Sequence, residues 1–231
     1  MKKKVFYTEI AYFVALIMVS FGNAFMEKAN LGINMVVAPV YLTHLKLVKT
    51  LPFFTFGFAE YTFQGILILI TMLVVRRAKI AYLFSFCTAL IYGTLLDLVM
   101  GFIAPIDASG MAMRILLFSA GVVLCAIGVS LMFHTYISPE AYELFVKETS
   151  KRYHLDINKF KLAYDCVSLV LGVILSFIFF GFGRFEGVKV GTVICAFVTG
   201  PLIGVFSRVF DSIWDFRDAL KYRSFFEASA R

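Results

Sequence analysis

Four polar side chains stand out because they lie inside long apolar stretches of the sequence. Glu60 and Gln64 are four positions apart, which places both on one face of a helix. Asp165 interrupts a later apolar stretch, and Asp97 lies nearer the end of another. A charge at the centre of a bilayer costs at least about 2.5–3.5 kcal/mol on insertion scales, so its presence needs a reason. Carboxylates there favour a cation or a proton, and we expect a substrate-binding site with Asp97 at its rim.

A structural alternative stays open for the same carboxylates. Glu60 and Asp165 lie near enough to the ends of their stretches to reach lipid headgroups, or to pair with Lys159 or Lys161. Gln64 and Asp165 are 101 positions apart, close to the spacing of an internal repeat described below. That spacing favours equivalent positions, both pointing to the middle of the membrane.

Further polar and backbone-bending positions complete the predicted site. Asn34, Thr192 and Thr199 are candidate substrate-binding residues. Gly200 and Pro201 follow each other in the last apolar stretch, where proline should break or bend a helix. Backbone groups freed by a break are tolerated only beside protein or a water-lined cavity. We therefore expect this pair to be a hinge or a lining element.

Composition indicates the kind of fold that must position these residues. Of the 231 residues, 61% are hydrophobic and 27 are Phe, whereas soluble domains are about 45–50% apolar. The natural surroundings of such a chain are lipid. The net charge of +7 does not indicate nucleic acid, because the basic residues cluster at the ends of the apolar stretches.

Six stretches are long enough to cross the hydrocarbon core as helices, which takes about 20 residues. They predict an all-α polytopic membrane protein with one transmembrane domain, residues 1–231, and a cytoplasmic tail, residues 211–231. The predicted spans are 8–26, 53–75, 79–103, 112–136, 160–181 and 188–210.

The six spans form two sets of three. Gly22 matches Gly128, 106 positions later, and the pattern A-x-x-x-G-x-L that begins at Ala89 recurs at Ala196, 107 positions later. Because three is odd, the second unit (112–210) must be inverted relative to the first (8–103). Inverted repeats of this kind recur in transporters.

The Lys and Arg residues predict the orientation. Of the 22, 16 lie on the side of the N-terminus and 6 on the other side. This bias predicts that both termini are cytoplasmic, in the inner membrane of a bacterium.

Two connectors are too short to cross and occupy matching places in the two units. Residues 30–44, interrupted by Gly32 and Pro39, predict a re-entrant or interfacial half-helix capped by Asn34. Residues 138–151 predict a second short helix, capped by Ser138, that is amphipathic and able to lie on the membrane surface.

Short glycine motifs carry a resemblance to a known family. The motifs are Gly22-x-Ala24 leading to Ala29-x-Leu31-Gly32, and Gly191-Thr192 leading to Gly200-Pro201. The chain resembles bacterial YczE/YitT-like integral membrane proteins, which implies a bacterial inner-membrane location and little chemistry. Ile33 and Asn34 stand where members often carry Pro or Ser, which puts any shared ligand in doubt.

Three functions fit these features. The first is a small secondary transporter or permease for a small substrate, with a cation favoured by the carboxylates. The second is a substrate-capture subunit of a multi-component transporter, and the third is a channel or regulatory scaffold. No enzyme motif is present, and neither a cofactor nor a metal site is predicted. The expected partners are the lipid bilayer and a small-molecule or ion substrate, with a homodimer or a partner membrane protein left open.

Overall fold

The computed structural model describes residues 3–182, 185–221 and 223, so the basic residues Lys2, Arg184 and Arg231 of the orientation count lie outside the described residues. Six of the helices in the described part are long and apolar enough to cross a membrane, and the predicted spans begin and end within three residues of them. The helices are α1 (Thr8–Ala29), α2 (Ala38–Leu47), α3 (Phe56–Val75), α4 (Ile80–Ile103), α5 (Met111–Phe133), α6 (Ala141–Tyr153), α7 (Ile157–Phe180) and α8 (Val190–Ile213), and the strands are β1 (Lys4–Tyr7) and β2 (Trp214–Arg217).

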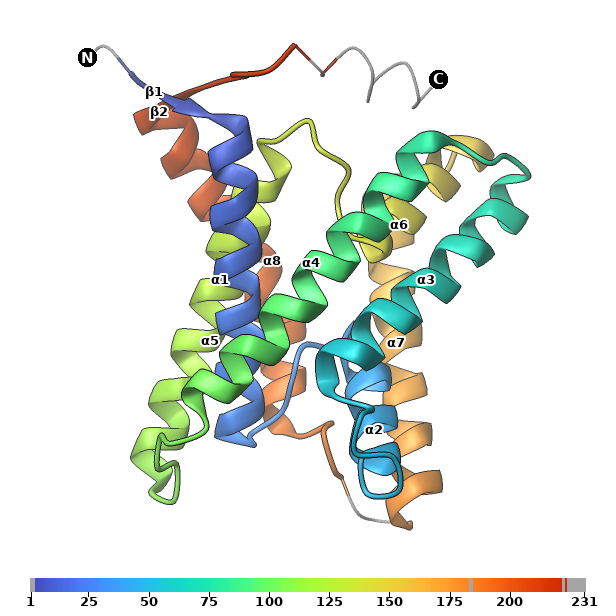
Figure 1. Cartoon of the computed structure of the whole chain (residues 1–231), viewed down its shortest axis with the longest axis vertical. Coiled ribbons are helices and arrows are strands. Elements are labelled where there is room, and N and C mark those ends of the chain that lie inside the picture. Colours follow the sequence, from blue (N-terminus) through green and yellow to red (C-terminus); the bar gives the residue numbers. More distant parts are fainter. Residues whose placement is uncertain (1–2, 183–184, 222, 224–231) are drawn as a thin grey trace.

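The centre of the bundle is the contact between α1 and α5, which run in opposite directions (Figure 1). A Cβ atom added to Gly22 would lie 2.8 Å from the carbonyl oxygen of Gly121, and one added to Gly128 would lie 2.8 Å from that of Ala15. Lipid gives no hydrophobic drive for helix association, so close packing through small residues has to hold such a pair together.

The contacts between α1 and α5 have the symmetry that an inverted repeat requires. Gly121 lies 106 positions after Ala15 in the sequence, and Gly128 lies 106 positions after Gly22. The contact of Gly22 with Gly121 therefore becomes the contact of Gly128 with Ala15, and both are present. A two-fold relation demands this exchange of partners. The matching glycines of the sequence thus lie at a pseudo-two-fold contact.

The two short helices α2 and α6 both begin inside the bundle and end at its opposite ends (Figure 1). The chain enters the bundle after α1, turns back, and returns along α2 to the end it came from. The same path is repeated at the other end after α5, along α6. Both connectors therefore enter the bundle, which fits the re-entrant one of the two arrangements expected for the short helices, whereas a surface position for residues 138–151 stays a prediction.

The apolar side chains at the start of α6 explain why this helix begins inside the bundle. Ala141, Tyr142 and Leu144 at its start are at most 4% exposed, whereas its charged residues Lys151 and Arg152 lie at the outer end. The helix begins at Ala141 with Glu140 as its N-cap residue, two residues later than a Ser138 cap would give. In the other connector, the Asn34 side chain accepts from Val36 N at 3.2 Å and so caps the turn before α2.

Each re-entrant segment packs on the opposite unit. Ile33 N donates to Thr192 Oγ1 at 3.2 Å, and Ser85 Oγ donates to the carbonyl of Pro139 at 2.6 Å. Ser85 and Thr192 are 107 positions apart, so the two contacts are equivalent under the repeat. Likewise, α2 packs on α7 and α6 packs on α3. The two units are therefore interlocked, and each completes the interior of the other.

The residues after α8 are tied to the beginning of α1. Strand β1 pairs in parallel with β2, and the Phe6 ring stacks on Trp214 at 4.7 Å. The Glu9 carboxylate accepts from the backbone N–H groups of Ala219 at 3.0 Å and Leu220 at 2.9 Å. The described part of the predicted tail is thus bound to the beginning of the chain through β1 and Glu9. Residues 222 and 224–231 of the tail lie outside the described residues.

Candidate functional site

Four polar side chains meet in the interior where α6 begins. Glu60 and Gln64 come from α3 and are both 0% exposed, as their spacing on one helix face predicted. Glu140 and Tyr142 come from the re-entrant segment and are 7% and 3% exposed. We call Glu60, Gln64, Glu140 and Tyr142 the central cluster.

The Gln64 amide joins the members of the central cluster. Its Nε2 atom donates to Glu60 Oε2 at 3.3 Å and to Glu140 Oε2 at 3.4 Å. Its Oε1 atom accepts from Ala141 N at 3.1 Å. The first N–H groups of a helix lack partners within the helix, and Glu140 makes no side-chain cap bond, so Gln64 of α3 supplies that cap. One side chain therefore fixes both the start of α6 and the distance between two carboxylates.

The central cluster has an incomplete set of partners. Tyr142 Oη donates to Glu60 Oε2 at 3.0 Å, but Glu60 Oε1 is buried without a hydrogen-bond partner in the part of the chain that the structure describes. The nearby cation, Lys161, pairs with Asp165 at 3.0 Å and lies 3.8 Å from Glu143. A buried oxygen atom without a partner is rare and needs an explanation, such as a bound ion, a proton or a water molecule.

Electrostatics favours a bound proton or cation. Burial raises the pKa of Glu140 well above its ordinary value, and the carboxylates of Glu143 and Glu60 raise it further, against the lowering effects of Gln64 and Lys161. Two carboxylates that share one amide in a dry interior cannot both be ionised without a compensating positive charge. The arrangement is therefore suited to taking up and releasing a proton or a small cation. No group of three or more His, Cys, Asp or Glu residues that could hold a metal ion occurs in the part of the chain that the structure describes.

A polar network from α1 and α4 holds the segment that carries Glu140. Thr88 Oγ1 contacts Tyr12 Oη at 2.7 Å and donates to the carbonyl of Ser138 at 3.0 Å. Close by, Asn23 Nδ2 donates to Tyr92 Oη at 2.7 Å, and Tyr92 is 0% exposed. The bond from Thr88 to Ser138 satisfies part of the backbone that the turn before α6 exposes, as irregular backbone inside a membrane protein requires.

The other two predicted carboxylates lie outside the central cluster. Asp97 accepts from Thr55 Oγ1 at 2.5 Å and from Gly57 N at 2.7 Å, so it caps the beginning of α3. Asp165 is buried and forms its ion pair with Lys161 on the face of α7 near α6, so its partner there is Lys161. This is the pairing that the structural alternative for Asp165 described. A role of either residue in substrate binding stays a prediction.

The predicted site residues of α8 lie on different faces of that helix, one buried and one exposed. Thr192 is buried, where it holds the first re-entrant segment through Ile33 N. Thr199 is half-buried, and Gly200 and Pro201 are exposed, with no atom of the described residues within 4 Å of a Cβ added to Gly200. Helix α8 continues through Pro201, so of the expected break or bend the break does not occur, whereas the bend and the hinge or lining role stay predictions.

Glu140 and Tyr142 were missed by the sequence argument, although one signal pointed to Glu140. The repeat offset of 106 maps Asn34 onto Glu140, and both stand just before a re-entrant helix. Tyr142 carries no such signal, because a tyrosine in an amphipathic stretch has the same pattern on a membrane surface.

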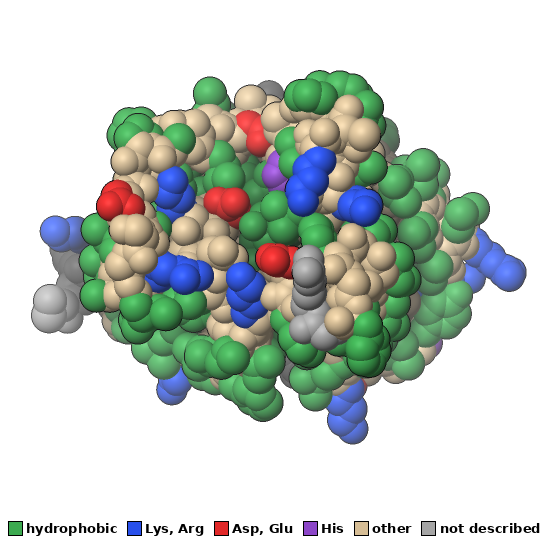
Figure 2. Space-filling view, turned by 90° about the horizontal axis from the view of Figure 1, so that it is seen from below, with side chains coloured by type: hydrophobic (Ala, Val, Ile, Leu, Met, Phe, Trp, Pro, Cys, Tyr) green, Lys and Arg blue, Asp and Glu red, His purple; other side chains and the backbone are tan. Residues whose placement is uncertain are grey.

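The end of the molecule where α2 ends has a different character from the interior. Figure 2 shows this face, on which acidic and basic side chains surround a hollow with hydrophobic side chains in it. At this end Lys189 Nζ donates to Asn30 Oδ1 at 2.6 Å, and Arg114 donates to the carbonyls of Ala29 and Asn30 at 2.7 Å. These cations complement the carbonyl end of α1.

Comparison with protein families gives one match. A family described as being of unknown function, DUF6198, matches residues 6–208, which is most of the chain. No curated protein and no solved structure matches the chain. This match does not confirm the resemblance to the YczE/YitT-like proteins, which stays a prediction.

Proposed function

We propose that this chain, which belongs to the DUF6198 family of unknown function, is a small secondary transporter that binds its substrate or coupling ion at the central cluster. The ligand is a proton or a small cationic solute. The transporter lies in the inner membrane of a bacterium, with both termini in the cytoplasm, and does not change its substrate chemically.

One observation carries this proposal. Two buried glutamates, Glu60 and Glu140, contact the same amide, and Glu60 Oε1 has no hydrogen-bond partner among the described residues. Intramembrane carboxylates are costly and mark ion pathways and proton relays in membrane proteins. A purely structural role would favour complete pairing of both carboxylates, whereas Glu60 Oε1 is not paired within the described residues.

The architecture around the pair supports movement of the bound ligand. The two re-entrant helices start in the interior and lead to opposite ends of the bundle (Figure 1). Secondary transporters commonly place substrate and ion sites near the membrane midplane, at the interface between inverted repeats and at interrupted helices. The central cluster is formed by α3 of one unit and the start of α6 of the other, so a small rotation of the units would alter it.

The first test is a ligand screen by thermal stability. A ligand that binds only the folded protein raises the apparent melting temperature through mass action. The purified protein is measured against a panel of cations and cationic metabolites, together with Glu60→Gln and the control Asp107→Asn, an exposed carboxylate in the turn after α4. We expect a stabilising ligand whose effect disappears in Glu60→Gln and persists in Asp107→Asn. A stabilising ligand with equal effects in all three proteins would contradict the assignment of the site.

Transport itself is measured in proteoliposomes with the ligand found in the screen. A secondary transporter shows saturable uptake that depends on an ion gradient, and Glu60→Gln should abolish it. Tight binding without uptake by the protein alone would favour the substrate-capture subunit. Flux that does not saturate with ligand concentration would favour a channel.

A further inference from the structure

One cation is shared by carboxylates of two helices where α7 begins beside α6. Lys161 Nζ lies 3.0 Å from Asp165 Oδ1, one turn later on α7, and 3.8 Å from Glu143 Oε1 of α6. The second distance is longer than the about 2.7–2.9 Å of a charge-assisted hydrogen bond, so this contact is electrostatic and is not fixed in direction. Lys161 is therefore bound to Asp165 and shared with Glu143.

The charge of Lys161 also reaches the central cluster. Burial is the largest of the effects that raise the pKa of Glu140, and the charges of Glu143 and Glu60 add to it, whereas the positive charge of Lys161 lowers this pKa. Glu143 follows Glu140 by three positions, so the two carboxylates lie on the same side of α6. Glu143 thus links the ion pair on α7 to the central cluster.

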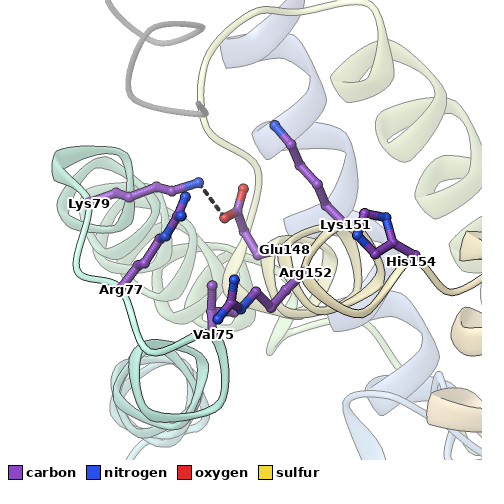
Figure 3. A pocket seen from close by; sticks show the side chains of 7 residues that line it. All are labelled: Val75, Arg77, Lys79, Glu148, Lys151, Arg152 and His154. Atoms are coloured by element: carbon purple, nitrogen blue, oxygen red, sulfur yellow. Dashed lines mark hydrogen bonds and ion pairs between the residues drawn. The ribbon is translucent and has the colours of Figure 1, made fainter.

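The carboxylate at the outer end of α6 has a cation of its own. Glu148 Oε2 lies 2.7 Å from Lys79 Nζ, and Figure 3 shows this pair between the α3–α4 turn and α6. At the inner end, Lys161 is the one Lys or Arg among the described residues that pairs with a carboxylate or acts on its charge. The inner carboxylates are Glu60, Glu140, Glu143 and Asp165. This region is therefore short of positive charge whenever the central cluster holds no ligand.

The side chain of Lys161 is able to carry its charge to more than one partner. Lys161 is half-buried, and its ammonium lies 5.6 Å from the centre of the Tyr164 ring. Phe145 of α6 packs on the same ring at 5.6 Å, so the ammonium lies beside the contact between α6 and α7. The four-carbon stem is flexible, and the ammonium has three rotatable donors, unlike the planar guanidinium group of arginine.

We propose that Lys161 is a tethered counter-cation of the central cluster: its ammonium pairs with Asp165 and Glu143 while the cluster holds a proton or a cation, and it moves towards Glu140 when the ligand leaves. Two buried carboxylates are costly without a compensating positive charge. The ammonium supplies this charge in the empty protein and competes with the ligand for Glu140. The inference rests on the proposed function, because it takes the central cluster as the ligand site, and it names the group that regulates this site.

The proton is the probe in the test, and the free energy of unfolding is measured in mixed micelles of dodecyl maltoside and dodecyl sulfate between about pH 5 and pH 7.5. The phenols and the thiol near the cluster stay mostly neutral in this range, with ordinary pKa values of about 10 and 8.5. His44 of α2, the other helix that packs on α7, contacts the carbonyl of Phe54 and should contribute equally in all variants. The ionisable groups around Glu140 and Lys161 are Glu60 on α3, Tyr92 on α4, Tyr12 on α1, Cys125 on α5, Tyr142 and Glu143 on α6, and Tyr164 and Asp165 on α7.

Two substitutions should move the pH profile in opposite directions. Glu140 keeps its proton to a higher pH in the folded than in the unfolded protein, so the free energy of unfolding falls as the pH rises towards the folded pKa. Lys161→Gln removes the compensating charge, raises this pKa further and should extend the fall by about one pH unit. Asp165→Asn releases the ammonium towards Glu140 and should shorten the fall by a similar amount. Lys161→Arg, which keeps the charge on a stiffer group, should lie between the wild type and Lys161→Gln.

Control variants separate the central cluster from the ion pair on α7. Lys159→Gln removes an exposed charge from the same helix and should leave the profile unchanged. In the background of Glu140→Gln, Lys161→Gln should lose most of its effect, because the group that it acts on no longer titrates. An effect of full size in that background would belong to Glu143 or Asp165 and would overturn the proposal.

The outcomes are distinct. Opposite shifts in Lys161→Gln and Asp165→Asn, both dependent on Glu140, support the tethered counter-cation. Shifts in the same direction, or no shift, overturn it, because a lysine fixed on Asp165 is a structural ion pair. Unfolding is measured without any flux, so this failure is distinguishable from failure of the proposed function, which ligand binding and uptake in Glu60→Gln decide.

Discussion

Replacing Gln64 by leucine tests the arrangement of the central cluster. Leucine is close to glutamine in volume but has no polar atoms, so the substitution removes hydrogen bonds with little change in packing. Gln64 makes three bonds that the structure gives: two donated to Glu60 and Glu140, and one accepted from Ala141 N. All three are lost in Gln64→Leu.

The structure sets the size of the effect. Hydrogen bonds in membrane proteins contribute about 0.6 kcal/mol each on average, which gives about 2 kcal/mol for three. Glu60 Oε2 keeps Tyr142 as a donor, but Ala141 N and Glu140 Oε2 lose the partner that they have. A buried polar group left without a partner costs about 1–3 kcal/mol. We therefore expect the free energy of unfolding to fall by about 2–5 kcal/mol.

The assay is reversible unfolding in mixed micelles of dodecyl maltoside and dodecyl sulfate, followed by circular dichroism. Leu69→Ala is the control, since Leu69 lies on the same helix and is 60% exposed. Gln64→Glu is the second variant, because it keeps an acceptor for Ala141 N but replaces the donor by a third carboxylate. It should be least stable above the pH at which that carboxylate ionises. If Gln64→Leu loses no more stability than Leu69→Ala, the amide does not hold the cluster together.

Three further predictions follow from individual contacts. Burial, with the charges of Glu143 and Glu60, raises the pKa of Glu140 in the folded protein. In the unfolded chain Glu140 loses its proton as the pH rises above the ordinary pKa of 4.5, whereas the folded protein keeps the proton to a higher pH. The free energy of unfolding therefore falls with rising pH until the pH passes the pKa of Glu140 in the folded protein. Glu140→Gln should flatten this slope in pH-dependent unfolding, and an unchanged slope would exclude Glu140 as its source. Gly22→Val should separate α1 from α5 and lower the free energy of unfolding by about 1–3 kcal/mol or more, while Gly101→Val, where a Cβ meets no described atom within 4 Å, should not. Asp97→Ala should lower it by about 1–2 kcal/mol through loss of the cap on α3, with faster hydrogen exchange at Gly57 N. Asp97→Asn, which keeps an acceptor oxygen, should lie nearer to the wild type.

The spans and the pairing of Glu60 with Gln64 could be predicted because both depend on local patterns. Apolar length determines which segments cross, and a spacing of four places two side chains on one helix face. The repeat was also readable, since Gly22 and Gly128 match at sequence level and lie at equivalent contacts.

The remaining part of the site depends on contacts between distant segments. Asp97 lies within an apolar stretch, and only the approach of α3 to α4 shows that its carboxylate caps Gly57 N. Glu140 precedes a helix that is amphipathic in sequence, a pattern shared by helices on a membrane surface. Only the exchange of re-entrant segments between the two units brings Glu140 to Gln64.

The pairing of β1 with β2 imposes an order on biogenesis. Strand β1 precedes all six long helices in the chain, whereas β2 follows the last of them. The N-terminal strand must therefore remain an open edge while five further spans enter the bilayer, and unpaired edges readily recruit foreign strands. Its short length, with Lys4 at one end, limits that hazard. A chain truncated before Trp214 and released from the ribosome would accordingly contain every span and leave the β1 edge open to degradation.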